Sequence, residues 1–166
     1  MGTETMSHHK RRAERDHMMR YEKLLPHILD LAALDDAALD ATALATAKLS
    51  FYDWLVVSCA GSAEPLAVIM RDFIASEAGT PIASVTGSAQ KFPARAAALA
   101  NGTISHALDY DDTHFAYVGH PSVAIFPAAL AAAEEVGASA ADVCKAFLLG
   151  AEVSCRIGMV LGRRHY

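Results

Sequence analysis

Apolar residues recur at helical spacing along almost the whole chain, and proline, glycine and serine mark where the segments begin and end. From this pattern we predict helices over residues 21–33, 37–60, from 65 to just before 78, 94–114, 121–135 and 140–161. Only residues 82–85 favour an extended conformation. Alanine is abundant and aromatic residues make up 7% of the chain, which favours closely packed helices over stacked sheets. The sequence therefore predicts an all-α fold, a compact multi-helix domain.

The predicted helix over residues 37–60 carries apolar side chains on several faces rather than on one stripe. These side chains are Leu44, Leu49, Phe51, Trp54, Leu55 and Val56. A helix that is apolar on several sides is usually packed against more than one neighbour. We therefore expect it to be buried against more than one neighbouring element, with its N-terminal cap at Asp35 or Asp36.

The first residues of the chain differ from the rest. Residues 1–19 mix basic and acidic side chains and contain no apolar run, so we expect a disordered or vector-derived leader and not a secretory signal. The helical domain is then expected over residues 20–166. The chain has a formal net charge of −5 and no basic stripe beyond the first twenty residues, which argues against nucleic acid as a partner.

Two further features concern the cellular compartment. The longest apolar run, residues 123–133, is interrupted by Pro127 and is shorter than the roughly 20 residues that a membrane span needs. Cys59, Cys144 and Cys155 form no C-x-x-C pair and lie in apolar helical patterns, so we expect buried, reduced thiols. Together these features predict a cytoplasmic protein that does not enter the membrane.

Polar residues gather in residues 101–114 and again in residues 119–122. If the first segment is helical throughout, one face of it presents His106, Asp109, Tyr110 and Thr113, with Asp112 at the edge and Asp111 pointing away. His120 directly precedes Pro121, which places it at the N-terminus of the next predicted helix. The positive end of that helix dipole attracts anions.

Two carboxylates and two imidazoles are costly to bury unless they pair or take part in chemistry. A structural polar network or a solvated helix face is the alternative interpretation of this segment. A metal-dependent helical hydrolase is another, with ligands drawn from His106, Asp109, Asp112, His114 and His120. The spacing matches neither H-E-x-x-H nor D-D-x-x-D, so we expect no metal ion.

The segment 97–114, followed by His-Pro-Ser at 120–122, resembles the signature of the MmgE/PrpD family. This family includes 2-methylcitrate dehydratase, cis-aconitate decarboxylase and iminodisuccinate epimerase. Residues 51–62, 131–139 and 150–158 resemble the flanking helices of the same family. The resemblance extends over residues 20–166 and implies the N-terminal part of the family's helical domain.

The resemblance implies lyase-type chemistry on a small polycarboxylate, by proton transfer next to a carboxylate and without a cofactor. Dehydration, decarboxylation and epimerisation all remain open, as does the substrate. Asp109 and His120 are the implied catalytic acid–base pair, and Thr113 and His106 the implied substrate-binding residues. Histidine suits such a role because its ordinary pKa lies near neutral pH.

Proteins of this family are much longer and carry a second, lid domain with cationic pocket residues. We therefore expect this polypeptide to be weakly active or inactive by itself, unless a separate chain supplies the lid. Lys91, Arg95 and Arg156 are candidate substitutes for the missing cations, although an ordinary surface charge is the favoured interpretation of each. The resemblance also implies a homodimer, and a catalytically inactive remnant that acts as a dimerising or binding module is the alternative function.

Overall fold

The structure, a computed structural model, describes residues 25–31, 33, 39–116 and 118–162. Residues 25–31 are helical, within the predicted first helix. Five longer helices and one small hairpin follow: α2 (Ala41–Gly61), α3 (Pro65–Ile74), β1 (Ala83–Ser84), β2 (Lys91–Phe92), α4 (Ala94–Ser105), α5 (Pro121–Val136) and α6 (Ala140–Leu161). The all-α prediction is confirmed, and the predicted leader lies outside the described residues.

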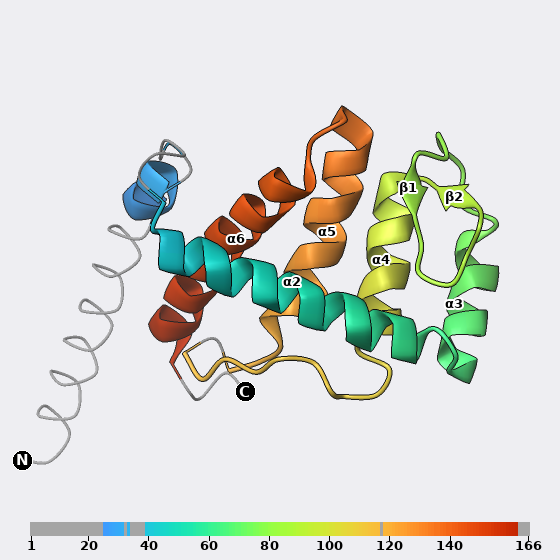
Figure 1. Ribbon diagram of the computed structural model, residues 1–166, viewed down its shortest axis with the longest axis horizontal. Coiled ribbons are helices and arrows are strands. Elements are labelled where there is room, and N and C mark those ends of the chain that lie inside the picture. Colours follow the sequence, from blue (N-terminus) through green and yellow to red (C-terminus); the bar gives the residue numbers. More distant parts are fainter. Residues whose placement is uncertain (1–24, 32, 34–38, 117, 163–166) are drawn as a thin grey trace, which may run out of the picture.

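Helices α4, α5 and α6 form one layer, with α5 between the other two, and α2 crosses this layer on one side (Figure 1). Helix α3 packs against α4 at the far end of the layer. The antiparallel hairpin β1–β2 also lies there, with Ala83 opposite Phe92. The predicted extended segment thus forms β1, while β2 was not predicted.

The helix boundaries follow local backbone chemistry. Pro65 and Pro121 occupy the first turns of α3 and α5, where the missing N–H of proline has no intrahelical partner to lose. Gly137 ends α5 in the left-handed conformation, with φ of 72°. Ser139 and Asp142 form a reciprocal capping box at the start of α6. These starts and stops were predicted and are confirmed.

The core is divided into two clusters. One lies between α3, α4 and the hairpin and consists mainly of alanine with Ile74, Val85 and Ile104. The other joins α2, α5 and α6 through aromatic rings. Phe126 lies at its centre, with its ring centroid 4.0 Å from that of Phe147 and 5.7 Å from that of Trp54. Small side chains in the first cluster let the helices approach closely.

Helix α2 begins later than predicted, and its packing follows the prediction in part. It begins at Ala41, and Asp40 is its N-cap, accepting a hydrogen bond from the backbone N–H of Thr42 at 3.3 Å. The predicted caps at residues 35 and 36 lie outside the described residues. The prediction that this helix packs against more than one neighbour is confirmed, because α2 contacts α4, α5 and α6. Leu49, Tyr52 and Val56 are nevertheless 68%, 67% and 51% exposed, among other apolar side chains. The described residues cover only one side of α2.

Two observations bear on the compartment. Among the described helices, none is by itself long and apolar enough to cross a membrane; α2 and α3 satisfy the length and composition test only as a pair, bent by 94° at their junction. The cysteine prediction holds for Cys144, whose burial raises the pKa of its thiol. It is wrong for Cys59, which is exposed, and Cys155 is partly buried.

Candidate active site

The helix that carries the polar segment is shorter than predicted. Helix α4 ends at Ser105, and His106 is its C-cap. The prediction of a helix to His114, with His106, Asp109 and Thr113 on one face, is therefore wrong. Continuing the helix would place three aspartates at its C-terminal end, where the helix dipole disfavours negative charge. Aspartate side chains also compete for backbone hydrogen bonds.

After His106 the chain forms a loop that returns to the start of α5. The backbone N–H of Asp109 donates to the carbonyl of His106 at 3.1 Å, and Asp109 adopts a left-handed φ of 55°. Further on, His114 and Gly119 form an isolated antiparallel bridge, with a 2.9 Å hydrogen bond from the His114 N–H to the Gly119 carbonyl. This turn brings His120 back toward His106.

Asp111 lies between the two histidines. Its side chain is 1% exposed. Nδ1 of His106 lies 2.9 Å from Oδ1 of Asp111, and Nδ1 of His120 lies 3.0 Å from Oδ2. The two imidazole rings are 4.9 Å apart, centroid to centroid. The predicted helix would have turned Asp111 away from both histidines, and the contact arises because this segment is a loop.

The other predicted site residues lie at the surface of this cluster. Asp109 has a side chain that is 76% exposed, and its Oδ1 lies 3.6 Å from Nε2 of His120. The His106 side chain is 48% exposed and that of His120 is 27% exposed. Thr113 is exposed on the same loop. The structure thus brings together three of the four predicted residues, and Thr113 forms no described hydrogen bond with them.

The N-terminus of α5 holds an anion, as its dipole predicts, but the anion is part of the chain. Asp112 accepts hydrogen bonds from the backbone N–H of Ser122 at 3.1 Å and from its hydroxyl at 2.7 Å. Because Ser122 is 1% exposed, this contact is shielded from solvent. Asp112 is therefore a structural anchor of the loop and is not available as a ligand at its surface.

Donor atoms in the cluster are close enough to consider a metal ion. His106, Asp109, Asp111 and His120 each offer one nitrogen or oxygen atom, and these atoms lie within 4.8 Å of one another. The donor types suit a divalent transition metal. His114, which the hydrolase alternative also invoked, contacts Cys155 instead, with 3.4 Å between Nδ1 and Sγ.

The candidate cations pair with glutamates and not with this cluster. Nζ of Lys91 lies 3.4 Å from Glu134, and Arg156 makes hydrogen bonds to Glu152 at 2.6 and 2.9 Å. Arg95 lies 3.7 Å from Glu77. In the part of the chain that the structure describes, none of these three side chains has an ion pair with the candidate site.

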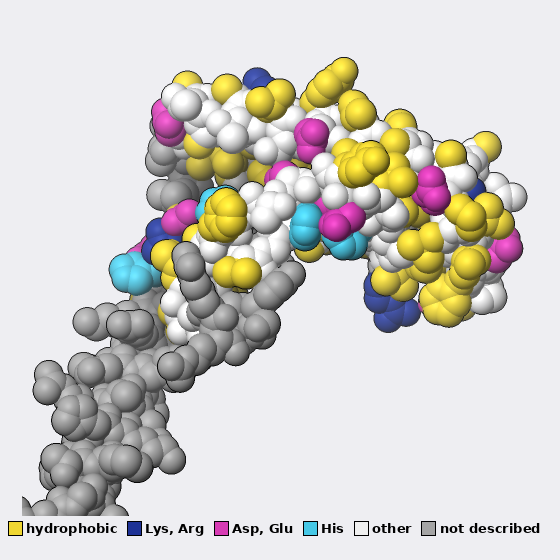
Figure 2. Space-filling view, turned by 90° about the horizontal axis from the view of Figure 1, so that it is seen from below, with side chains coloured by type: hydrophobic (Ala, Val, Ile, Leu, Met, Phe, Trp, Pro, Cys, Tyr) yellow, Lys and Arg dark blue, Asp and Glu magenta, His cyan; other side chains and the backbone are white. Residues whose placement is uncertain are grey.

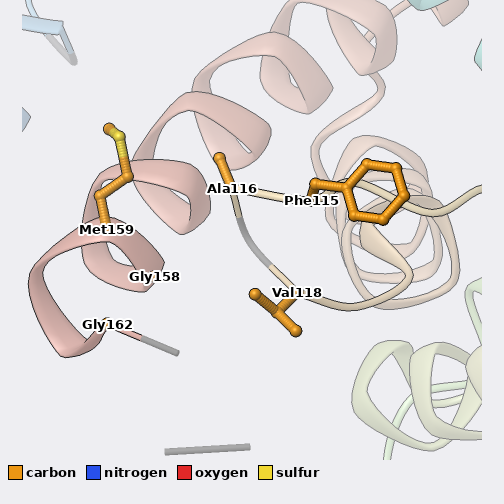
Figure 3. A pocket seen from close by; sticks show the side chains of 6 residues that line it. All are labelled: Phe115, Ala116, Val118, Gly158, Met159 and Gly162. Atoms are coloured by element: carbon orange, nitrogen blue, oxygen red, sulfur yellow. The ribbon is translucent and has the colours of Figure 1, made fainter. Parts of the chain in front are cut away.

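Histidine and acidic side chains gather near the middle of one face of the molecule, at its surface (Figure 2). A separate hollow of about 250 Å³ lies between the loop and the end of α6 (Figure 3). This hollow is formed by Phe115, Ala116, Val118, Gly158, Met159 and Gly162, so none of the described residues that line it has a titratable side chain. The candidate for acid–base chemistry is therefore the histidine–aspartate cluster.

The model of the MmgE/PrpD N-terminal domain matches residues 31–166, a range that contains every helix from α2 to α6 and the whole histidine–aspartate cluster. No curated protein matched the chain at a significant level. The match covers most of the sequence, and the chain therefore belongs to the MmgE/PrpD family, as a form of its N-terminal domain.

Proposed function

We propose that this chain supplies acid–base groups for lyase-type chemistry on a small polycarboxylate, with dehydration of 2-methylcitrate as the reference reaction and no cofactor. The observation that carries the proposal is the pair formed by Asp109 and His120, 3.6 Å apart at the surface of the cluster. Both residues lie within the segment that the family model matches.

In the proposed reaction, one member of the pair removes a proton from the carbon next to a substrate carboxylate. The other member donates a proton to the departing hydroxyl group, which leaves as water while a carbon–carbon double bond forms. A histidine and a carboxylate in contact suit these opposite tasks because their ordinary pKa values differ. His106 and Thr113 are the proposed contacts for substrate carboxylates, since both are exposed and His106 lies next to His120, with 4.9 Å between the ring centroids.

The described residues form only one wall of such a pocket. Asp109, Asp111 and Asp112 make the wall acidic, whereas a polycarboxylate needs cationic or hydrogen-bond-donating partners. We therefore propose that further cationic groups face this wall, from a lid domain or a separate chain. Association as a homodimer is part of the proposal, supported by large exposed apolar side chains on α2 and α3. A cytoplasmic location accords with the free cysteines.

The test is an assay of 2-methylcitrate dehydration and cis-aconitate decarboxylation by the wild type and by Asp109→Asn and His120→Gln. Each substitution is expected to lower kcat about 10²- to 10⁴-fold, the usual worth of a general acid or base. Asparagine is the informative replacement at Asp109 because it tolerates the left-handed φ of 55°. Asp72→Asn, an exposed change on α3, is the matched control. Activity that survives both site substitutions would contradict the proposed site.

Two outcomes would favour the alternative functions. A well-folded wild type that turns over neither substrate but self-associates would support a dimerising or binding module, which the exposed apolar side chains also favour. Stoichiometric metal in protein without a histidine tag would contradict the metal-free mechanism. That result would favour a metal-dependent hydrolase built on the four donor residues.

A further inference from the structure

The proposed acid–base pair does not include the buried carboxylate of Asp111, so the role of this residue remains to be explained. We propose that Asp111 is a positioning residue that fixes the neutral forms of His106 and His120 as Nδ1–H tautomers. At His120, Nε2 is then the nitrogen that accepts or delivers a proton. At His106, Nε2 takes up a proton before it donates a hydrogen bond to a substrate carboxylate. The inference rests on the proposed function for what Nε2 does, whereas the tautomers themselves do not depend on any turnover.

The hydrogen-bond partners of the two rings carry the inference. Nδ1 of His106 lies 2.9 and 3.0 Å from the two carboxylate oxygens of Asp111. Nδ1 of His120 lies 3.0 Å from Oδ2 and 3.2 Å from the backbone carbonyl oxygen of the same residue. An ionised carboxylate and a carbonyl accept hydrogen bonds and donate none. Both Nδ1 atoms must therefore carry the proton, and in a neutral ring Nε2 keeps its lone pair.

Because the Asp111 carboxylate is buried, it needs the hydrogen bonds that the two Nδ1–H groups donate. The Asp111 side chain is 1% exposed, and a carboxylate in such a place is costly unless donors satisfy it. The two imidazoles are the side chains that contact its oxygens. His106 follows the last residue of α4 and His120 precedes the first residue of α5. One carboxylate therefore holds the rings of both helix ends in a fixed orientation.

The fixed tautomer has a direct chemical consequence at His120. Its Nε2 faces Asp109, 3.6 Å from Oδ1, and both groups lie toward the surface of the cluster. A proton on Nδ1 keeps the Nε2 lone pair free to accept a substrate proton. Asp111 thereby stabilises the ring as it becomes positively charged, without itself contacting the substrate.

Metal binding is the competing explanation for the same cluster. A metal ion bonded to Nδ1 would displace the proton that the tautomer requires, so the two arrangements exclude each other at that atom. Nδ1 of His106 lies at hydrogen-bond distance from Oδ1 of Asp111, at 2.9 Å, and Nδ1 of His120 lies at hydrogen-bond distance from the Asp111 carbonyl oxygen, at 3.2 Å. This geometry favours the hydrogen-bonded arrangement, and the test below includes metal as an outcome.

The decisive measurement is the tautomer of each ring in the full 166-residue chain. Long-range ¹H–¹⁵N correlation spectra distinguish Nδ1–H from Nε2–H in neutral histidine, and His106→Gln and His120→Gln assign the two rings. Both rings are expected as Nδ1–H. An Nε2–H tautomer at either ring would overturn the proposal, and so would one equivalent of Zn²⁺ that removes both Nδ1 protons at micromolar concentration.

Asp111→Asn tests the cause of the tautomer. The amide presents an N–H₂ donor as well as an oxygen, so one or both rings are expected to lose the fixed Nδ1–H form. Asp112→Asn, the same change at the neighbouring residue that contacts Ser122, is expected to leave both tautomers unchanged. Two unchanged rings in Asp111→Asn would overturn the proposal. If that variant does not fold, the wild-type spectra still decide. If both rings are Nδ1–H but the protein shows no turnover, that result would contradict the proposed function and would still support the role of Asp111.

Discussion

Asp112 caps a helix that begins nine residues after it. Its carboxylate accepts hydrogen bonds from the backbone N–H of Ser122 at 3.1 Å and from the hydroxyl at 2.7 Å. A negative side chain here satisfies an unpaired N–H at the start of α5 and interacts favourably with the helix dipole. The contact also closes the loop that carries His106, Asp111 and His120.

Asp112→Ala is expected to lower the free energy of unfolding by roughly 1–2 kcal/mol, the usual cost of losing an N-terminal cap. Asp112→Asn retains an oxygen acceptor and is expected to lose less. Urea denaturation followed by circular dichroism measures both changes. The control is Asp72→Ala, an exposed change on α3. An equal loss in the control and in Asp112→Ala would contradict the capping role.

The contact between Glu134 and Ser84 predicts a dependence of stability on pH. Glu134 on α5 accepts hydrogen bonds from the Ser84 backbone N–H at 2.7 Å and from its hydroxyl at 2.6 Å. Burial raises the pKa of Glu134, but the hydrogen bonds from Ser84 and the nearby charge of Lys91 outweigh it. The pKa of Glu134 therefore lies below its usual value of 4.5.

A carboxyl with a lowered pKa in the folded state stabilises the fold wherever it is ionised in both states. This contribution is present above pH 4.5, the usual value, and is lost as the pH falls through the lower pKa of the folded protein. Glu134→Gln is expected to cost roughly 1–3 kcal/mol near neutral pH, as for hydrogen bonds to a charged group. Denaturation curves of both proteins between about pH 7 and pH 3 measure the difference. A difference that does not shrink on acidification would contradict the assignment.

Gly61 is predicted to be intolerant of any side chain. A Cβ atom there would overlap the carbonyl oxygen of Ile104, where the end of α2 meets α4. A backbone atom moves only with its helix, so Gly61→Ala is expected to cost about 3 kcal/mol. In an exposed helix the same change would be favourable by up to about 1 kcal/mol.

Gly150→Ala on α6 is the matched comparison. Its Cβ would lie 2.7 Å from Cγ2 of Ile125, a side-chain atom and not a backbone atom, so a small shift of one side chain can relieve the overlap. The expected loss is therefore smaller than at Gly61, and thermal or urea unfolding ranks the two variants. Greater destabilisation by Gly150→Ala than by Gly61→Ala would contradict the claim that the close approach of α2 and α4 leaves no room for a side chain at residue 61.

The helix boundaries were predictable where single residues dictate backbone conformation. Pro121 and Gly137 mark α5, and Ser139 with Asp142 marks the start of α6. The role of Asp111 was not predictable in the same way, because helical spacing was extended past Ser105 into a segment that is a loop. In a loop, which side chains meet depends on turns such as the left-handed Asp109, and spacing does not encode them.

The exposure of one apolar side of α2 was also not predictable from the sequence. Apolar residues surround this helix, yet only the stripe formed by Ala47, Trp54, Val57, Ser58 and Gly61 is buried. Hydrophobicity indicates that a face is suited to contact, but the number of neighbouring elements decides whether it is covered. In the described part of the chain, only one layer of helices is available to cover it.

The contacts of the histidine–aspartate cluster join residues close together in the sequence. Asp111 is five residues from His106 and nine from His120. Closing such short loops costs little chain entropy, and proteins rich in contacts of low sequence separation fold faster than those dominated by long-range contacts. The cluster is thus a feature of low contact order, whose assembly requires only the ends of α4 and α5 to meet.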